Sequence, residues 1–184
     1  NYGARMVRWH YFLRVLGIRI GLVPSAAIFL SGLSMTISPG RVGELAKCYF
    51  LKDKFNVPVA RSAAAVIAER IMDVFSVLLL SAWGLFLLPY GWAVAVVLLL
   101  AFAGFVLLMV SPWGSSKLLS LPMPGRWRPF LTSSRDAFQQ IFTFRPVLFA
   151  MLLSLLAWLA EGSALWLILR GLDAPGSPGH AISI

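Results

Sequence analysis

Three charged side chains follow a Ser-Pro-Gly turn at three-residue intervals, namely Arg41, Glu44 and Lys47. Ser38 is a favourable N-cap residue, and Pro39 suits the first helical position because its missing N–H would have no partner there. The sequence therefore predicts a helix that begins at this turn and carries the three charges on one face. It is expected to end near Leu51, because the charges at 52–54 indicate contact with water. A helix N-terminus beside a guanidinium group offers oriented N–H donors and a favourable dipole, and this arrangement binds phosphate.

Two glycines leave the start of this helix open to another backbone or to a ligand, because they carry no side chain. The candidate phosphate-binding residues are therefore Ser38, Gly40, Arg41 and Gly43. Glu44, one turn further on, is placed either to hold Arg41 or to exchange a proton. The same spacing also fits an ordinary turn with an internal Arg–Glu pair, and both interpretations stay open at this point.

A second group of charges lies further along the chain, at Glu69, Arg70 and Asp73. The two acids are four residues apart and share a helix face, and Arg70 reaches Asp73 at a spacing of three. Together with Lys47 these side chains are candidates for proton coupling or for binding a basic group. They also fit a buried network in which Arg70 neutralises the acids and fixes helix packing, and the two interpretations are compatible. Glu161 stands alone in an apolar stretch, so we expect it in the bundle interior, either paired with an arginine or protonated.

The composition indicates a membrane protein. Of 184 residues, 59% are hydrophobic and 12% are charged, about half the charged share of a soluble domain. The net charge of +9 comes from bases between the apolar runs, which is the positive-inside pattern and does not indicate nucleic acid. One cysteine and two histidines predict no internal disulfide and no metal cluster, and no cofactor motif is present.

The expected architecture is all-α, a polytopic transmembrane helix bundle forming a single membrane domain over residues 1–184. Apolar stretches suited to membrane helices occur at 22–37, in the second half of 58–88, at 92–110 and at 147–169. The chain begins without a methionine and ends as a new apolar stretch starts, so we expect a fragment of a longer protein with further segments at both ends.

Two basic stretches have helical apolar stripes. In residues 4–20 the stripe lies away from Arg5, Arg8 and Arg19. The stripe consists of Met6, Trp9, Phe12, Leu13, Leu16 and Ile20. This pattern favours an interfacial amphipathic helix in an anionic headgroup region, although the end of a transmembrane helix followed by a loop is an alternative. Residues 111–146 predict a second surface-lying helix, which starts near Pro129.

Charge placement constrains the topology. The basic segments 1–19, 52–61 and 111–146 are expected on the cytoplasmic side, and the chargeless turn at 89–92 outside. Two full crossings between residues 19 and 52 would need about 40 apolar residues, and only residues 22–37 are clearly available. A re-entrant helical hairpin with its tip at residues 38–40 therefore fits better. Non-helical backbone at that depth requires surrounding protein or a wet cavity.

The two charged motifs together resemble a known family. SPGRVGE at residues 38–44 and AERIMD at residues 68–73 match the (T/S)PG-x-x-GE turn and E-R-x-x-D helix of the flippase-like integral membrane family. This family includes the transmembrane region of lysylphosphatidylglycerol synthases. The resemblance implies a membrane domain with re-entrant segments that moves or presents lipids. In the synthases the lipid is an aminoacylated phospholipid, and other relatives occur beside glycosyltransferases that use polyprenyl phosphates.

The expected function is therefore the binding and translocation, or presentation, of a phosphate-bearing lipid in the cytoplasmic membrane. The expected partners are anionic phospholipid or polyprenyl phosphate, and a lipid-modifying transferase. The alternative is the membrane module of an aminoacyl- or glycosyl-transferring enzyme whose catalytic domain lies elsewhere. The sequence has no glycine-rich nucleotide loop, GxSxG motif or histidine dyad, so an enzyme is the less favoured interpretation.

Overall fold

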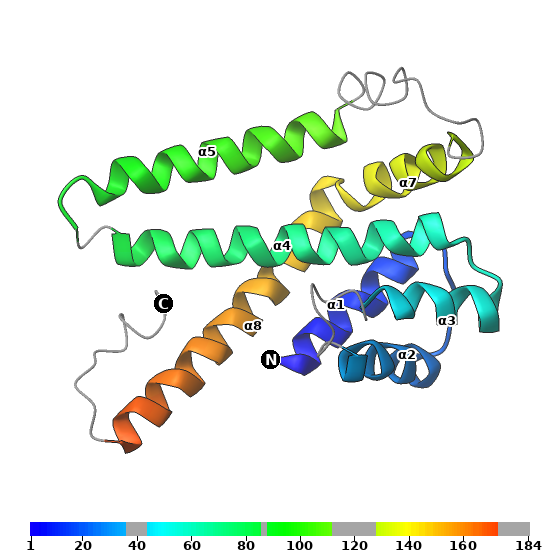
Figure 1. Ribbon diagram of the computed structural model, residues 1–184, viewed down its shortest axis with the longest axis horizontal. Helices are drawn as coiled ribbons and strands as arrows, with labels where there is room; N and C mark the ends of the chain where they lie inside the picture. The colour runs from blue at the N-terminus through cyan, green and yellow to red at the C-terminus, as the bar shows by residue number, and fades with distance from the viewer. Residues whose placement is uncertain (36–43, 86–87, 112–127, 173–184) are drawn as a thin grey trace.

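The structure is a computed structural model that describes residues 1–35, 44–85, 88–111 and 128–172. Every regular element in these ranges is helical, which confirms the predicted all-α class (Figure 1). The helices are α1 (Tyr2–Val15), α2 (Leu22–Ser34), α3 (Ala46–Phe55), α4 (Val59–Leu85), α5 (Gly91–Val110), α7 (Arg128–Ile141) and α8 (Phe144–Gly171).

Helix α4 is the central element of the fold. It packs against α1, α3, α5, α7 and α8, and it lies along the long axis of the molecule (Figure 1). Its first half is buried through small side chains such as Ala64, Ala65 and Ala68, which allow neighbouring helices to approach closely. The sequence predicted an unbroken helix from residue 58 to residue 88, and this prediction is confirmed to within three residues at either end.

Helices α2 and α3 pack against each other as an antiparallel pair, with the connecting residues 36–43 outside the described part of the chain (Figure 1). At 1.5 Å per residue they are about 20 Å and 15 Å long, well short of the roughly 30 Å of a hydrocarbon core. Helix α3 continues to Phe55, beyond the end near Leu51 that the charges at 52–54 suggested. It ends where Asn56 adopts a left-handed conformation with φ 53°.

Helix α1 differs from the expected surface helix. The predicted apolar stripe exists, and Trp9, Phe12 and Leu13 are fully buried. However, α1 packs against α2, α4, α7 and α8, so the apolar stripe faces protein and not the lipid of a leaflet, as an interfacial helix would require. Arg8 was expected away from the stripe but is only 1% exposed. The physical reason is that acidic residues of α4 provide Arg8 with buried partners.

The C-terminal region contains one amphipathic and one apolar helix. Helix α7 packs on α4 and buries Ala137 and Ile141, while much of its surface is exposed.

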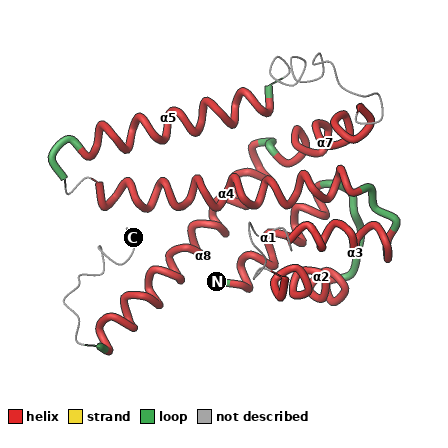
Figure 2. Tube along the Cα trace, in the orientation of Figure 1, coloured by secondary structure: helices red, strands yellow, loops and turns green. Residues whose placement is uncertain are grey.

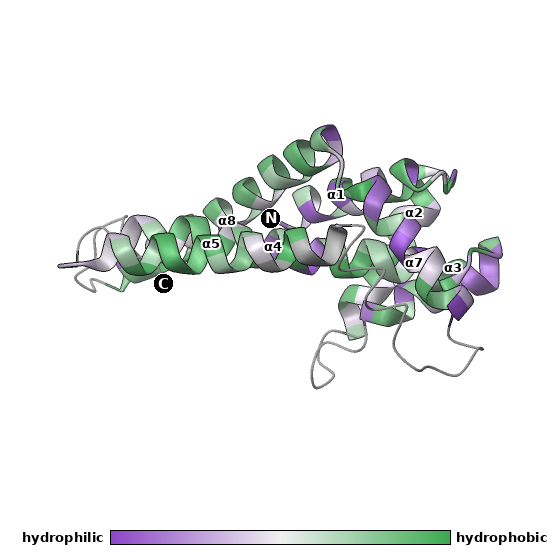
Figure 3. Ribbon diagram, turned by 90° about the horizontal axis from the view of Figure 1, so that it is seen from above, coloured by the Kyte–Doolittle hydropathy of each residue, from purple (hydrophilic) through white to green (hydrophobic). Residues whose placement is uncertain are grey.

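Helix α8 is long and apolar enough to cross a membrane, judged by length and composition within the described residues. Helix α2 and the stretch Gly91–Gly104 are shorter apolar helices. Apolar residues dominate the end of the molecule formed by α5, α8 and the second half of α4 (Figure 3). The full number of membrane spans stays a prediction.

The two connections that flank the α2–α3 pair lie at the opposite end of the molecule from the turn that follows α4. The connections 16–21 and 56–58 lie at the end where α4 begins, whereas the turn at 88–90 lies at the far end (Figure 2). The pair α2–α3 therefore returns to the end from which it started. A re-entrant hairpin requires such a chain path, whereas the placement of this pair within the membrane, and which end faces the cytoplasm, stay predictions.

Candidate functional site

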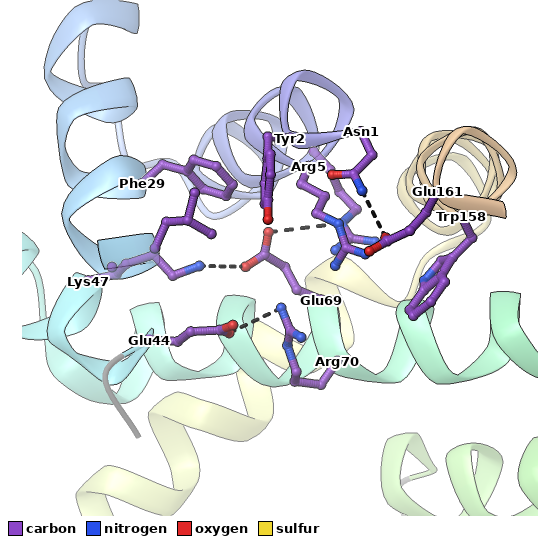
Figure 4. A pocket seen from close by; sticks show the side chains of 13 residues that line it. Asn1, Tyr2, Arg5, Phe29, Glu44, Lys47, Glu69, Arg70, Trp158 and Glu161 are labelled. Carbon is purple, nitrogen blue, oxygen red and sulfur yellow. Dashed lines mark hydrogen bonds and ion pairs between the residues drawn. The ribbon is translucent and has the colours of Figure 1, made fainter. Parts of the chain in front are cut away.

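Charged side chains from four helices, and from the residue pair that precedes α3, converge on one cavity of about 110 Å³. Figure 4 shows side chains of α1, α3, α4 and α8 directed toward one another around this space. The charged lining residues are Arg5, Arg8, Glu44, Lys47, Glu69, Arg70 and Glu161. A space of this size holds several water molecules or a small anionic group.

The shortest ion pair of Glu69, and a deeply buried one, joins it to Lys47. Lys47 Nζ lies 2.9 Å from Glu69 Oε2, and the two side chains are 3% and 1% exposed (Figure 4). The ammonium group also lies 4.5 Å from the centre of the Trp9 ring and 5.3 Å from that of Phe29, distances at which cation–π attraction operates. The Lys47 stem crosses α2 at Gly32, where a Cβ would overlap the Cγ of Lys47. The glycine therefore lets α2 approach α3 closely enough for Lys47 to reach the cavity.

Arg8 links α1 to α4 and α8. Its Nη1 donates to Asp73 Oδ1 at 2.7 Å and also to Ser154 Oγ. Its Nε lies 3.9 Å from Glu69 Oε1, which is an ion pair without a hydrogen bond. Arg8 therefore contacts both Glu69 and Asp73. It can reach both because the two acids lie on one face of α4, as the sequence predicted.

A more exposed set of charges surrounds the buried contacts of Arg8, Lys47 and Glu69. Arg70 bridges Glu44 at 3.1 Å and Asp73 at 3.4 Å, the second contact being the predicted spacing of three. Arg5 contacts Asp73 at 3.0 Å and Glu161 at 3.3 Å.

Two further contacts define the α8 side of the cavity. Glu161 accepts a hydrogen bond from Asn1 at 2.8 Å, and its side chain is 49% exposed. Its pairing with an arginine agrees with one of the predicted alternatives, whereas its location at the rim differs from the predicted interior position. Trp158, one turn earlier on α8, lies under the Arg5 guanidinium, with 5.2 Å between Cζ and the ring centre. The α8 side of the cavity therefore combines a carboxylate with an aromatic ring.

Formal charges balance within the described network. The four cations Arg5, Arg8, Lys47 and Arg70 face the four carboxylates of Glu44, Glu69, Asp73 and Glu161. Such pairing explains why so many charges can be buried, because an unpaired buried charge is strongly unfavourable. Within the described part of the chain, no group of three or more His, Cys, Asp or Glu side chains is arranged to hold a metal ion.

The pairing leaves some hydrogen-bonding capacity unused. Arg8 Nε and Nη2 and Glu69 Oε1 are buried and have no hydrogen-bond partner among the described residues. The same holds for Arg70 Nε and Trp158 Nε1, on two further residues that line the cavity. Buried polar atoms usually have partners, so unpaired donors and acceptors grouped around one cavity indicate a binding site.

The sequence identified part of this site. Glu44, Lys47, Glu69 and Arg70 line one cavity, and Asp73 binds the arginines beside it, but Ser38, Gly40, Arg41 and Gly43 lie outside the described residues. Arg5 and Arg8 were missed as site residues because they were interpreted as headgroup-binding bases. The signal that could have found them is the placement of three acids in apolar stretches, Glu69, Asp73 and Glu161, with Arg70 as the one base within a turn of any of them. Each buried carboxylate needs a cation, so further cations had to come from elsewhere in the chain.

The fold and the site define an all-helical protein with a long apolar helix and a buried network of paired charges where its helices meet. The chain belongs to the family described as the lysylphosphatidylglycerol synthase TM region, whose family model matches residues 1–184. The family resemblance drawn from the two motifs is thereby confirmed, and the chain is a member of a membrane protein family.

A more distant similarity concerns a curated protein. A stretch of 79 residues is 29% identical to Glycosyltransferase AglD of Haloferax volcanii. It covers 42% of this chain and 12% of the glycosyltransferase, so the match is to a small part of that protein. No solved structure matches the chain.

Proposed function

We propose that this protein binds the phosphate-bearing headgroup of a membrane lipid in the charged cavity and moves the lipid across the bilayer. The lipid is an aminoacylated phospholipid or a polyprenyl phosphate, and the cavity opens alternately to the two sides. Family membership supports a role in the membrane, and the cavity supports the headgroup chemistry. The hairpin residues Ser38, Gly40, Arg41 and Gly43 would contribute to the same phosphate site.

The observation that carries the proposal is the state of Arg8. Its side chain is 1% exposed and lines the cavity, yet two of its nitrogens have no hydrogen-bond partner among the described residues. A network that served helix packing alone would satisfy a buried guanidinium, because unpaired buried donors cost about 1–3 kcal/mol each. Arg5 and Lys47 line the same cavity, so a phosphate there would meet three cations.

The balanced charges also suggest how binding couples to protons. A phosphate group adds negative charge to a network that is already neutral, which favours proton uptake by a carboxylate. Glu44 and Glu69 line the cavity and are the candidate proton acceptors, joined by Asp73 when the phosphate draws Arg5 and Arg8 away from it. The carboxylates would also contact an ammonium group on the lipid, as an aminoacylated headgroup provides.

The test is transbilayer movement in liposomes containing the full-length protein with a fluorescent phospholipid or a fluorescent polyprenyl-phosphate analogue. We expect movement with the wild type and its loss in Arg8→Gln and Glu69→Gln. Arg14→Gln is the matched control because Arg14 lies on the same helix and is exposed. Equal movement in wild type and Arg8→Gln, at equal protein levels, would contradict the proposal.

The partial match to a glycosyltransferase favours a second candidate function. In this case the cavity binds the same lipids but presents them to a catalytic domain on the same chain or on a partner. This candidate predicts Arg8-dependent lipid binding without transbilayer movement in the wild type. The liposome assay, combined with a lipid-binding measurement, therefore separates the two functions.

A further inference from the structure

A second hollow lies beside the charged cavity, between α4 and α8. It measures about 340 Å³, and its lining is Arg70, Asp73, Val74, Val77, Leu78 and Trp158. Most of its wall on α4 is aliphatic, and Val74 is 47% exposed, so the hollow is an open apolar groove on the side of the bundle. From Arg70 to Leu78 the groove follows roughly 12 Å of α4.

The groove and the cavity are neighbours that share part of their walls. Among the described residues, Arg70 and Trp158 alone line both. On the cavity side of this shared pair the walls are mostly charged. On the groove side they are aliphatic apart from Asp73, whose carboxylate is paired with arginines. The change in character therefore occurs over a single turn of α4 and at a single aromatic side chain of α8.

The shared residues carry unused hydrogen-bond donors. Arg70 Nε and Trp158 Nε1 are buried and have no hydrogen-bond partner among the described residues. A tryptophan with an apolar ring and a free N–H suits the boundary between hydrocarbon and polar groups. Donors at this boundary match the ester oxygens that join a lipid headgroup to its hydrocarbon chain.

We propose that the groove holds the hydrocarbon chain of the lipid whose phosphate occupies the cavity. The lipid thus enters sideways between α4 and α8, and the site binds an amphiphile more tightly than a free anion. Arg70 and Trp158 contact the linkage between headgroup and chain, and Val74, Val77 and Leu78 contact the chain. This inference rests on the proposed function, because it assumes a phosphate in the cavity.

The test compares the binding of inorganic phosphate with that of butyl, hexyl and octyl phosphate to the full-length protein in lipid nanodiscs. Val74→Trp fills the groove and is tolerated by the fold because Val74 is half exposed. Val97→Trp on α5 is the matched control, since Val97 is 64% exposed and lies outside the groove. The alkyl chains of these ligands also partition into the nanodisc lipid. This partitioning is equal for all variants, so it cancels from the ratio of a variant's affinity to that of the wild type.

We expect Val74→Trp to leave inorganic phosphate binding unchanged and to weaken octyl phosphate by about tenfold or more, since each fully buried methylene contributes about fourfold. The weakening grows with chain length, and Val97→Trp follows the wild type. Leu78→Ala, which removes apolar wall without filling the groove, weakens octyl phosphate by several-fold.

Two results would overturn the inference in distinguishable ways. If Val74→Trp matches the wild type at every chain length while Arg8→Gln weakens all ligands, the groove is not the chain site and the phosphate site remains. If Arg8→Gln changes no affinity, the proposed function fails and the inference fails with it.

Discussion

Replacing Lys47 with methionine isolates the buried Lys47–Glu69 pair. Methionine keeps an unbranched stem against Gly32 and Trp9, so packing is largely preserved and the charge is removed. Lys47 provides the only hydrogen bond that Glu69 has among the described residues, at 2.9 Å. After the change, Glu69 would retain only the Arg8 Nε contact at 3.9 Å.

The expected loss follows from the burial of both partners. Removing one member of a buried ion pair typically costs about 3–5 kcal/mol, because the remaining charge is left without compensation. Loss of the cation–π contacts adds roughly 0.5–2 kcal/mol, and the distant Arg8 contact and protonation of Glu69 offset part of the total. We therefore expect Lys47→Met to lower the free energy of unfolding by about 3–5 kcal/mol near neutral pH.

The assay is denaturant unfolding of the full-length protein in mixed micelles, with Lys54→Met as the control. Lys54 lies on the same helix and is exposed, so its replacement should change the free energy of unfolding by less than about 1 kcal/mol. The double variant Lys47→Met/Glu69→Met should recover at least half of the loss, because no unpaired carboxylate remains. A loss below about 1 kcal/mol in Lys47→Met, or a double variant whose loss equals the sum of the two single losses, would refute the reasoning.

Three further predictions address the packing, the rim and the coupling of the site. Gly32→Ala should displace the Lys47 stem and lower the free energy of unfolding by about 1–3 kcal/mol, whereas Gly104→Ala should be nearly neutral because a Cβ there meets no other atom within 4 Å. Glu161→Gln should cost less than about 1 kcal/mol in the same assay, because the Glu161 side chain is 49% exposed. Octyl phosphate should bind more tightly at lower pH with net proton uptake, detected by calorimetry in buffers of different ionisation enthalpy. A binding enthalpy that is independent of the buffer would contradict the coupling.

The sequence predicted elements best where the signal was local. The length of α4 and the Arg70–Asp73 contact follow from helical spacing along one segment, and both are observed. The role of Arg8 could not be predicted in this way, because its partner Asp73 lies 65 residues away. Charge also misled the assignment of α3, since exposed Lys52 indicated a helix end although it belongs to the last turn.

A local sequence pattern determines neither the long-range partner of a side chain nor the extent to which the side chain is buried. The apolar stripe of α1 has the same form whether it faces lipid or protein, because both are apolar. Only the packing of α1 against four other helices shows that it faces protein. The error for Glu161 has the opposite direction. This acid was expected in the interior because it stands alone in an apolar helix, but it lies at the rim of the cavity and contacts Arg5 and Asn1.

The most direct test of the central claim is solid-state NMR on the full-length protein in bilayers. The protein carries ¹⁵N-labelled arginine, and phosphorus–nitrogen dephasing is measured on a bound phosphate-bearing lipid. The account predicts dephasing of the lipid ³¹P signal by arginine nitrogens, with a clear decrease in Arg8→Lys and none in Arg14→Lys. Dephasing that is absent, or that is unchanged in Arg8→Lys, would show that the phosphate does not occupy the charged cavity.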